Sequence, residues 1–174
     1  MKKIAIIYGA PSEYSRLRGI TDYYALQLAE RGNEVKIIYP QQLPADKLLG
    51  ADFTNEVIQA AVRKVAEADA VIVATPVYKA SFSGFIKVFM DMLPQRGLED
   101  KVVLPVAIGG TLAHLLMIDY AVRPVVTAMA NSHCLQGVYA IDKWVTKQED
   151  GSYSMEADLE VRIQDSIEKL LLAL

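Results

Sequence analysis

Residues 70–84 read AVIVATPVYKASFSG, and this stretch decides the fold. Its first part, Ala70–Ala74, is a short, continuous apolar run rich in Ile and Val. Such a run is typical of a strand that is buried on both faces of a parallel sheet. Proline and glycine then indicate a rigid turn, and an amphipathic stretch begins at Gly84. The stretch therefore predicts a strand, a loop and a helix in succession.

The same unit repeats along the chain, because apolar runs alternate with amphipathic stretches from end to end. We predict five strands, at Lys3–Tyr8, Glu34–Tyr39, Ala70–Ala74, Val102–Ile108 and Gly137–Ile141. We predict five helices, at Leu17–Arg31, Phe53–Glu67, Gly84–Leu93, Ala113–Ala130 and Ala157–Leu172. These units fit a flavodoxin-like α/β fold, a three-layer doubly wound sheet of five parallel strands in the order 2-1-3-4-5 with helices on both faces.

Length and composition narrow the class of protein. The 174 residues suffice for one core, and no repeat or linker divides them, so we expect a single domain over residues 1–174. A hydrophobic share of 52% excludes disorder, and a net charge of −3 without a basic stripe argues against nucleic acid. The uncharged run 102–118 is too short to span a membrane. One cysteine, Cys134, and no signal-peptide pattern lead us to expect a cytoplasmic protein.

Ligands of doubly wound sheets bind beyond the carboxyl ends of the strands, so the loops after strands one, three and four are the candidates. The first, residues 9–18, reads GAPSEYSRLR and leads into a helix N-terminus, which favours anions. It lacks the glycine pattern of a dinucleotide loop and the Gly-Lys-Ser/Thr of a P-loop, so a single phosphate fits it better. The alternative is an ordinary turn in which Ser15 is the helix N-cap and the arginines are solvated.

The other two loops offer a place for a flat ring. After the third strand, Tyr78 and the backbone of residues 77–79 can line a planar ligand, unless Tyr78 and Phe82 only cover the sheet edge. After the fourth strand, Gly109-Gly110-Thr111 lets a ligand approach the backbone. A phosphate at the first loop and a ring between the other two describe FMN.

Several motifs carry a resemblance to a known family: TPVYK at 75–79, Ser83-Gly84, the Gly-Gly-Thr loop at 109–111 and AHLL at 113–116. In this order and spacing they resemble the NADPH-dependent FMN reductase family, most of all the flavin reductase component of the two-component alkanesulfonate monooxygenase system. The first loop departs from the family pattern, since Ala10 and Ser12 stand where the family commonly has Ser and Arg.

The resemblance implies hydride transfer from NADPH, with NADH left open, to FMN, and release of reduced FMN to an FMNH2-dependent monooxygenase. No catalytic acid–base side chain is implied, because the flavin supplies the redox chemistry. The implied cofactor-binding residues are Ser12, Ser15, Arg16, Pro76, Val77, Tyr78, Lys79, Gly109, Gly110 and Thr111, with Arg18 as a supplement.

The resemblance also implies a homo-oligomer, a dimer or tetramer, in which Lys87 and Asp91 face a neighbour; the alternative for this pair is a surface i,i+4 ion pair. Tyr120 lies opposite the apolar stripe of its helix, beside Asp119 and Arg123. The resemblance places it at a π-bulge in the subunit interface that keeps the flavin exchangeable. An exposed tyrosine is the alternative.

Two other functions stay open. A quinone or azo-compound reductase would keep FMN bound, and a flavodoxin-like electron carrier would need a Thr-rich first loop, which this chain lacks. We expect His114 to have a structural role, and a contact with a ligand or a neighbouring chain is the alternative. His133 and Cys134 do not share a metal-ligand spacing with it, so we expect no metal site, and Cys134 is expected to be an inert, partly buried thiol.

Overall fold

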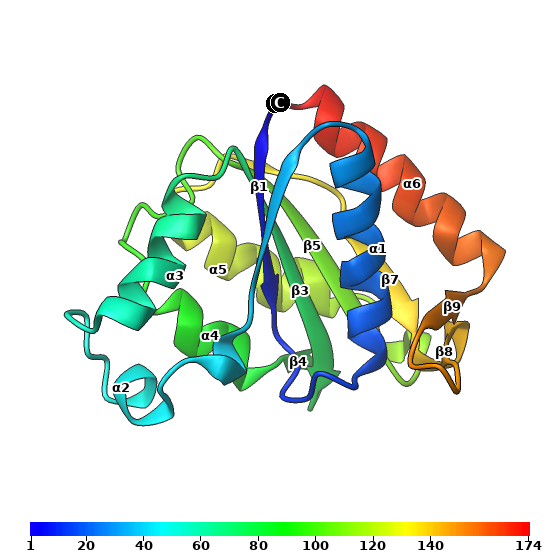
Figure 1. The fold of residues 1–174 in the computed structure, drawn as a ribbon, viewed down its shortest axis with the longest axis horizontal. Coiled ribbons are helices and arrows are strands. Elements are labelled where there is room, and N and C mark those ends of the chain that lie inside the picture. The colour runs from blue at the N-terminus through cyan, green and yellow to red at the C-terminus, as the bar shows by residue number, and fades with distance from the viewer.

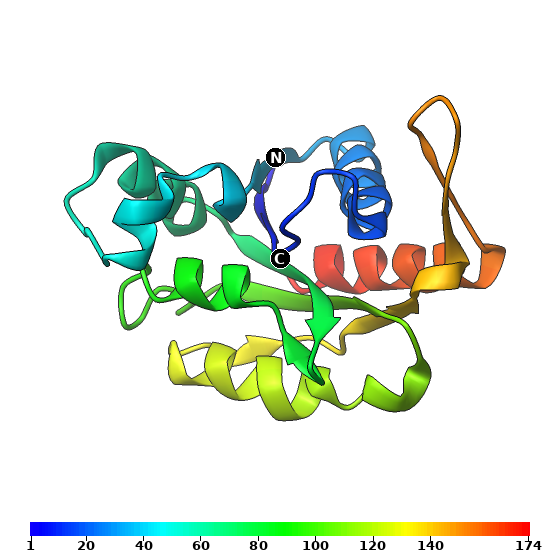
Figure 2. The ribbon, with the colours of Figure 1, turned by 90° about the horizontal axis from the view of Figure 1, so that it is seen from below.

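The computed structural model describes residues 1–174 as three layers, a parallel sheet between two layers of helices (Figures 1 and 2). The main strands are β1 (Lys3–Tyr8), β2 (Glu34–Ile38), β3 (Ala70–Tyr78), β5 (Val102–Gly109) and β7 (Val138–Ile141). They run in the order β2-β1-β3-β5-β7, which confirms the predicted order and fold class. The short strand β6 (His133–Cys134) pairs with the start of β5, and β7 pairs with its end.

Helices cover both faces of the sheet. Helices α1 (Arg16–Glu30) and α6 (Ala157–Leu172) cover one face, and α3 (Glu56–Ala66), α4 (Gly84–Met90) and α5 (Arg123–Ala128) cover the other (Figure 2). The short α2 (Ala45–Leu49) and a 3-10 turn at Pro40–Gln42 follow β2. Four of the five predicted helices exist, but Gly84–Leu93 ends early at Met90, and Phe53–Glu67 begins late at Glu56, where Asn55 is the N-cap.

The core is divided by the sheet because successive side chains of a strand point to opposite faces. In β1, Ile4, Ile6 and Tyr8 pack under α1 and α6, whereas Ala5 and Ile7 pack under α3 and α4. All five side chains are buried. This two-sided burial explains why the strands read as continuous apolar runs.

The prediction of one helix over Ala113–Ala130 was wrong. The segment contains a 3-10 turn at Leu112–His114, a π-helix at Ile118–Val122, and then α5. Pro124 has no N–H to donate and lies in the first turn of α5, where a helix tolerates proline. The π-helix lies where the family resemblance implied a bulge at Tyr120.

The prediction that the third strand ends at Ala74 was also wrong. Strand β3 continues to Tyr78 and turns back through Lys79 and Ala80 into the short β4 (Ser81–Phe82). Lys79 and Ala80 have φ of 49° and 62°, as the central residues of a type I′ turn do. The turn was missed because Asn and Gly, the usual residues of such turns, are absent from it.

A second hairpin was missed altogether. Strands β8 (Val145–Lys147) and β9 (Tyr153–Met155) pair antiparallel after a 3-10 turn at Asp142–Trp144, and the hairpin stands out beside α1 (Figure 2). In the loop of this hairpin, Gly151 has φ of 85°. None of the helices in the structure combines the length and apolar character that crossing a membrane requires.

Candidate functional site: the carboxyl edge of the sheet

Hydrogen bonds tie the first and third loops together at the carboxyl edge of the sheet. The Gly9 N–H donates to the Ala74 carbonyl at 2.8 Å, and the buried Ser83 hydroxyl donates to the Gly9 carbonyl at 2.5 Å. The Ser83 N–H in turn donates to the Thr75 hydroxyl at 2.9 Å. A methyl group at Gly9 would overlap Ile86, so the close contact needs glycine. The two loops therefore form one rigid wall.

The first loop presents unpaired donors. Ser15 is the N-cap of α1, since its hydroxyl accepts from the Leu17 N–H at 3.2 Å. The alternative of an ordinary turn predicts the same cap. The backbone N–H groups of Ser12, Glu13 and Arg16 donate to no acceptor within the chain. Three free donors beside the positive end of a helix can bind an anion.

The two arginines of this loop differ in what they contact. The exposed Arg16 donates from Nε to the Val145 carbonyl at 2.9 Å, and the rest of its guanidinium is free. Arg18 is held by Asp22 at 3.2 Å, with Glu13 at 4.0 Å, and the hydrogen bond to Asp22 raises the pKa of Arg18. Arg16 is therefore the arginine available to a phosphate.

The third loop supplies an aromatic side chain and a cation at the surface. Pro76 is buried within β3, where it lies opposite Ile108 of β5, and Val77 is half-buried. Tyr78 is 49% exposed, and Lys79 projects from the turn. The predicted residues thus divide into two that shape the strand end and two that can touch a ligand.

The fourth loop again presents free backbone. The N–H groups of Gly110 and Thr111 have no acceptor within the chain, and a side chain at Gly110 would meet only Asp142 Oδ2 at 3.9 Å. Gly109 instead packs against the Tyr139 hydroxyl, which donates to the Thr111 carbonyl at 2.7 Å. Burial, with a contribution from the Asp142 charge, raises the pKa of Tyr139 and keeps it a donor.

Sequence reasoning missed Tyr139 and also Tyr8, whose hydroxyl donates to the Ser12 carbonyl at 2.6 Å. The hydroxyl of each tyrosine thus donates a hydrogen bond to the carbonyl of a loop residue. A signal was present, since each lies in a predicted strand whose other residues are almost all aliphatic. A tyrosine in such a position usually needs a hydrogen-bond partner.

The remaining predicted residues lie outside this edge. Lys87 and Asp91 form an exposed ion pair on α4 at 2.7 Å. Tyr120 is 79% exposed, and the pair of Asp119 and Arg123 beside it measures 3.2 Å. Cys134 is half-buried as expected, and burial raises the pKa of its thiol. The structure assembles no group of three His, Cys, Asp or Glu side chains that could hold a metal ion.

The arrangement suits a mononucleotide with a planar ring. Unpaired donors at the first loop can bind a phosphate, whereas those at Gly110 and Thr111 can bind the polar edge of a ring. The open space at Gly110 allows that ring to approach the backbone. A flavodoxin-like fold with these features at its topological switch point defines a class of flavin-binding oxidoreductases.

Comparison with known proteins agrees with that class. Residues 2–146 match the family described as NADPH-dependent FMN reductase. An FMN reductase (NADPH) of Pseudomonas putida KT2440 is 41% identical over 172 residues, which are 98% of this chain and 87% of the relative. An FMN reductase (NADPH) of Escherichia coli K12 is 40% identical, over 82% of this chain and 75% of the relative.

A solved structure is similar over the whole chain. The apo form of an NADH:FMN oxidoreductase, EMOB, superposes with a TM-score of 0.89 at 34% identity and covers 100% of this chain and 90% of its own. The chain therefore belongs to the NADPH-dependent FMN reductase family. It is an oxidoreductase of the class that uses NADPH and FMN.

Proposed function

We propose that the chain binds FMN at the carboxyl edge of the sheet as an exchangeable substrate, reduces it with NADPH, and releases reduced FMN to a separate monooxygenase of the alkanesulfonate type. When bound, the flavin supplies the hydride-accepting chemistry. The protein contributes position: Ser12, Ser15 and Arg16 hold the phosphate, Tyr78 and Lys79 lie along the ring, and the loop at 109–111 binds its polar edge. We place the reaction in the cytoplasm, as the single cysteine suggests.

One observation carries this assignment. Five backbone N–H groups without acceptors, at Ser12, Glu13, Arg16, Gly110 and Thr111, lie on the loops that follow β1 and β5, the strands on either side of β3. Neutral donors of this kind bind a phosphate more weakly than a cluster of charged side chains would. Moderate affinity is what a flavin that must leave the enzyme requires.

The proposed function includes assembly into a homo-oligomer. Leu112, Leu115, Leu116 and Tyr120 expose between 47% and 79% of their surface on one short segment around the π-helix. A cluster of exposed apolar side chains marks an interaction surface. We propose that a second copy of the chain covers this segment in a dimer or tetramer, that Tyr120 packs in this interface, and that Lys87 and Asp91 face a neighbouring subunit.

A second function is favoured by an apolar cavity of about 360 Å³ between residues 40–49 and α4. Tyr78 and Phe85 line it, so it adjoins the proposed wall of the flavin ring. An apolar organic acceptor, such as a quinone, would suit such a lining. In that case FMN would stay bound and pass its electrons to this acceptor.

The two functions are separated by following NADPH oxidation by the purified protein with and without added free FMN. Activity that requires FMN in excess over protein supports the proposal. A yellow protein that turns over a quinone without added FMN supports the second function. Absence of NADPH oxidation under both conditions contradicts both.

A further inference from the structure

Two buried tyrosines contact the two loops that carry the unpaired N–H groups. Tyr8 is the last residue of β1, Tyr139 lies in β7, and both side chains are buried. The Tyr8 hydroxyl donates to the Ser12 carbonyl at 2.6 Å, and the Tyr139 hydroxyl donates to the Thr111 carbonyl at 2.7 Å. Phenylalanine would fill either position without needing a hydrogen-bond partner, so the hydroxyls indicate a role beyond packing.

Each of these carbonyls belongs to a peptide whose N–H lies on the opposite side. The chain contains no cis peptide bond, and in a trans peptide the C=O and the N–H point in opposite directions. Because the Ser12 carbonyl is directed at the buried Tyr8 hydroxyl, the Glu13 N–H points away from it. In the same way, the Leu112 N–H points away from Tyr139. Both N–H groups donate to no acceptor within the chain.

Tyr8 is well placed to fix its peptide. Its ring packs against that of Tyr39, with 5.3 Å between the ring centroids. Burial raises the pKa of Tyr8, so the hydroxyl keeps its proton and stays a donor. The Ser12 carbonyl also accepts from the Ser15 N–H, but at 3.3 Å, so the Tyr8 hydroxyl is the closer of its two partners.

Tyr139 is fixed by the strand end beside it. Its hydroxyl occupies the space that a side chain at Gly109 would take, so the glycine allows the phenol to reach the loop. The loop then presents three successive free N–H groups, at Gly110, Thr111 and Leu112. Tyr139 holds the peptide that carries the last of the three.

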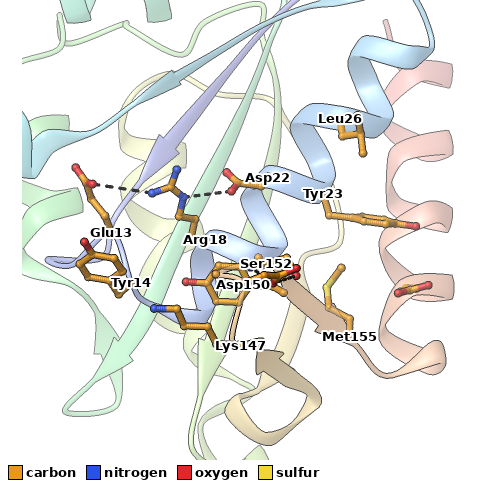
Figure 3. Close-up of a pocket in the computed structure, with 14 residues that line it drawn as sticks. Glu13, Tyr14, Arg18, Asp22, Tyr23, Leu26, Lys147, Asp150, Ser152 and Met155 are labelled. Atoms are coloured by element: carbon orange, nitrogen blue, oxygen red, sulfur yellow. Dashed lines mark hydrogen bonds and ion pairs between the residues drawn. The ribbon is translucent and has the colours of Figure 1, made fainter.

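The carboxylate of Glu13 is engaged by other side chains and leaves its own N–H available. It accepts from Gln42 Nε2 at 2.6 Å and lies 4.0 Å from the Arg18 guanidinium. Figure 3 shows the Glu13 side chain directed toward Arg18. The nearby guanidinium offsets part of the negative charge, so an anion can approach the Glu13 N–H.

We propose that Tyr8 and Tyr139 are positioning residues for two different parts of FMN. Tyr8 directs the Glu13 N–H at the phosphate, and Tyr139 directs the Leu112 N–H at the polar edge of the ring. Each tyrosine acts through the peptide that it holds rather than by touching the flavin. The inference rests on the proposed function, since it takes the phosphate to lie at the first loop and the ring edge at the fourth.

The test compares Tyr8→Phe and Tyr139→Phe with Tyr24→Phe, at a buried tyrosine of α1 whose hydroxyl lies 2.6 Å from that of Ser166. Fluorescence titration gives the Kd of FMN and of riboflavin for each variant. Tyr8→Phe should weaken FMN about three- to tenfold, as loss of one hydrogen bond does, and riboflavin less than about twofold. Tyr139→Phe should weaken both flavins by a similar factor, since both carry the ring edge. The control should change neither by more than about twofold.

Amide signals in proton–nitrogen NMR spectra separate positioning from a general loss of stability. In the wild type, FMN should shift the signal of Glu13 and riboflavin should not, whereas both flavins should shift that of Leu112. Tyr8→Phe should abolish the first response and keep the second, and Tyr139→Phe should do the reverse.

Unchanged FMN binding in Tyr8→Phe, or equal losses of FMN and riboflavin in that variant, would overturn the inference. So would responses of Glu13 and Leu112 that are as large in the tyrosine variants as in the wild type. A wild-type protein that binds FMN and riboflavin with the same Kd, and whose Glu13 signal does not respond to FMN, would instead refute the phosphate site of the proposed function.

Discussion

Arg16 is the side chain on which phosphate binding at the first loop depends most. Arg16→Ala should weaken FMN binding by about 1–3 kcal/mol, because a charge-assisted hydrogen bond is lost, and should leave riboflavin, which has no phosphate, much less affected. Ser15→Ala should act in the same direction. Fluorescence titration with both flavins measures the difference.

The matched control for this prediction is Arg18→Ala, because Arg18 is already engaged by Asp22 and Glu13. We expect the control to change FMN binding less than Arg16→Ala does. Equal losses of FMN and riboflavin in Arg16→Ala would contradict a phosphate site at this loop.

Gly109 allows the Tyr139 hydroxyl to approach the backbone closely, and a double variant can test this contact. A methyl group at this position would overlap the Tyr139 hydroxyl, so Gly109→Ala should destabilise the protein by about 1–3 kcal/mol. Tyr139→Phe removes that oxygen together with its bond to the Thr111 carbonyl and should cost about 1 kcal/mol alone. The double variant should be more stable than the sum of the single losses predicts. Strictly additive losses in urea unfolding would mean that the two residues do not interact.

Among the elements, those predicted correctly are the ones whose residues carry a local pattern. The apolar runs of β1, β3 and β5 and the amphipathic α3 set the sheet order and so the place of the site. The β8–β9 hairpin has strands of three residues, too short for periodicity, although Asp150-Gly151 is a turn signal that could have indicated it. The π-helix depends on packing that no local pattern records. Tyr139 and the free N–H groups need the tertiary structure to be recognised.

The π-helix at Ile118–Val122 can be tested by a deletion. Deleting Tyr120 should convert it to regular helix, because it removes the extra residue of the wide turn. We expect the variant to keep its fold, to retain more flavin on purification and to deliver less reduced FMN to a partner monooxygenase. A deletion variant that purifies colourless, turns over free FMN normally and keeps its oligomeric state would make Tyr120 an ordinary surface residue.

For the whole molecule, the exposed apolar segment around the π-helix leads to a prediction of assembly. Sedimentation at micromolar concentration should give a dimer or tetramer rather than a single species of 19.2 kDa. Leu116→Glu places a charge in this segment and should shift the equilibrium toward smaller species, whereas Leu49→Glu, at an exposed leucine of α2, should not. A wild-type monomer would rule out the interface.

The central claim, that FMN binds at the carboxyl edge of the sheet with its phosphate at the first loop, is tested most directly by hydrogen–deuterium exchange. The protein is measured alone, with FMN and with riboflavin. We predict that FMN slows exchange in peptides covering residues 10–18, 75–82 and 109–114, since the free N–H groups of the first and fourth loops become hydrogen-bonded. Riboflavin should slow the last two but not the first. Slowed exchange confined to other segments, or identical protection of residues 10–18 by both flavins, would contradict the claim.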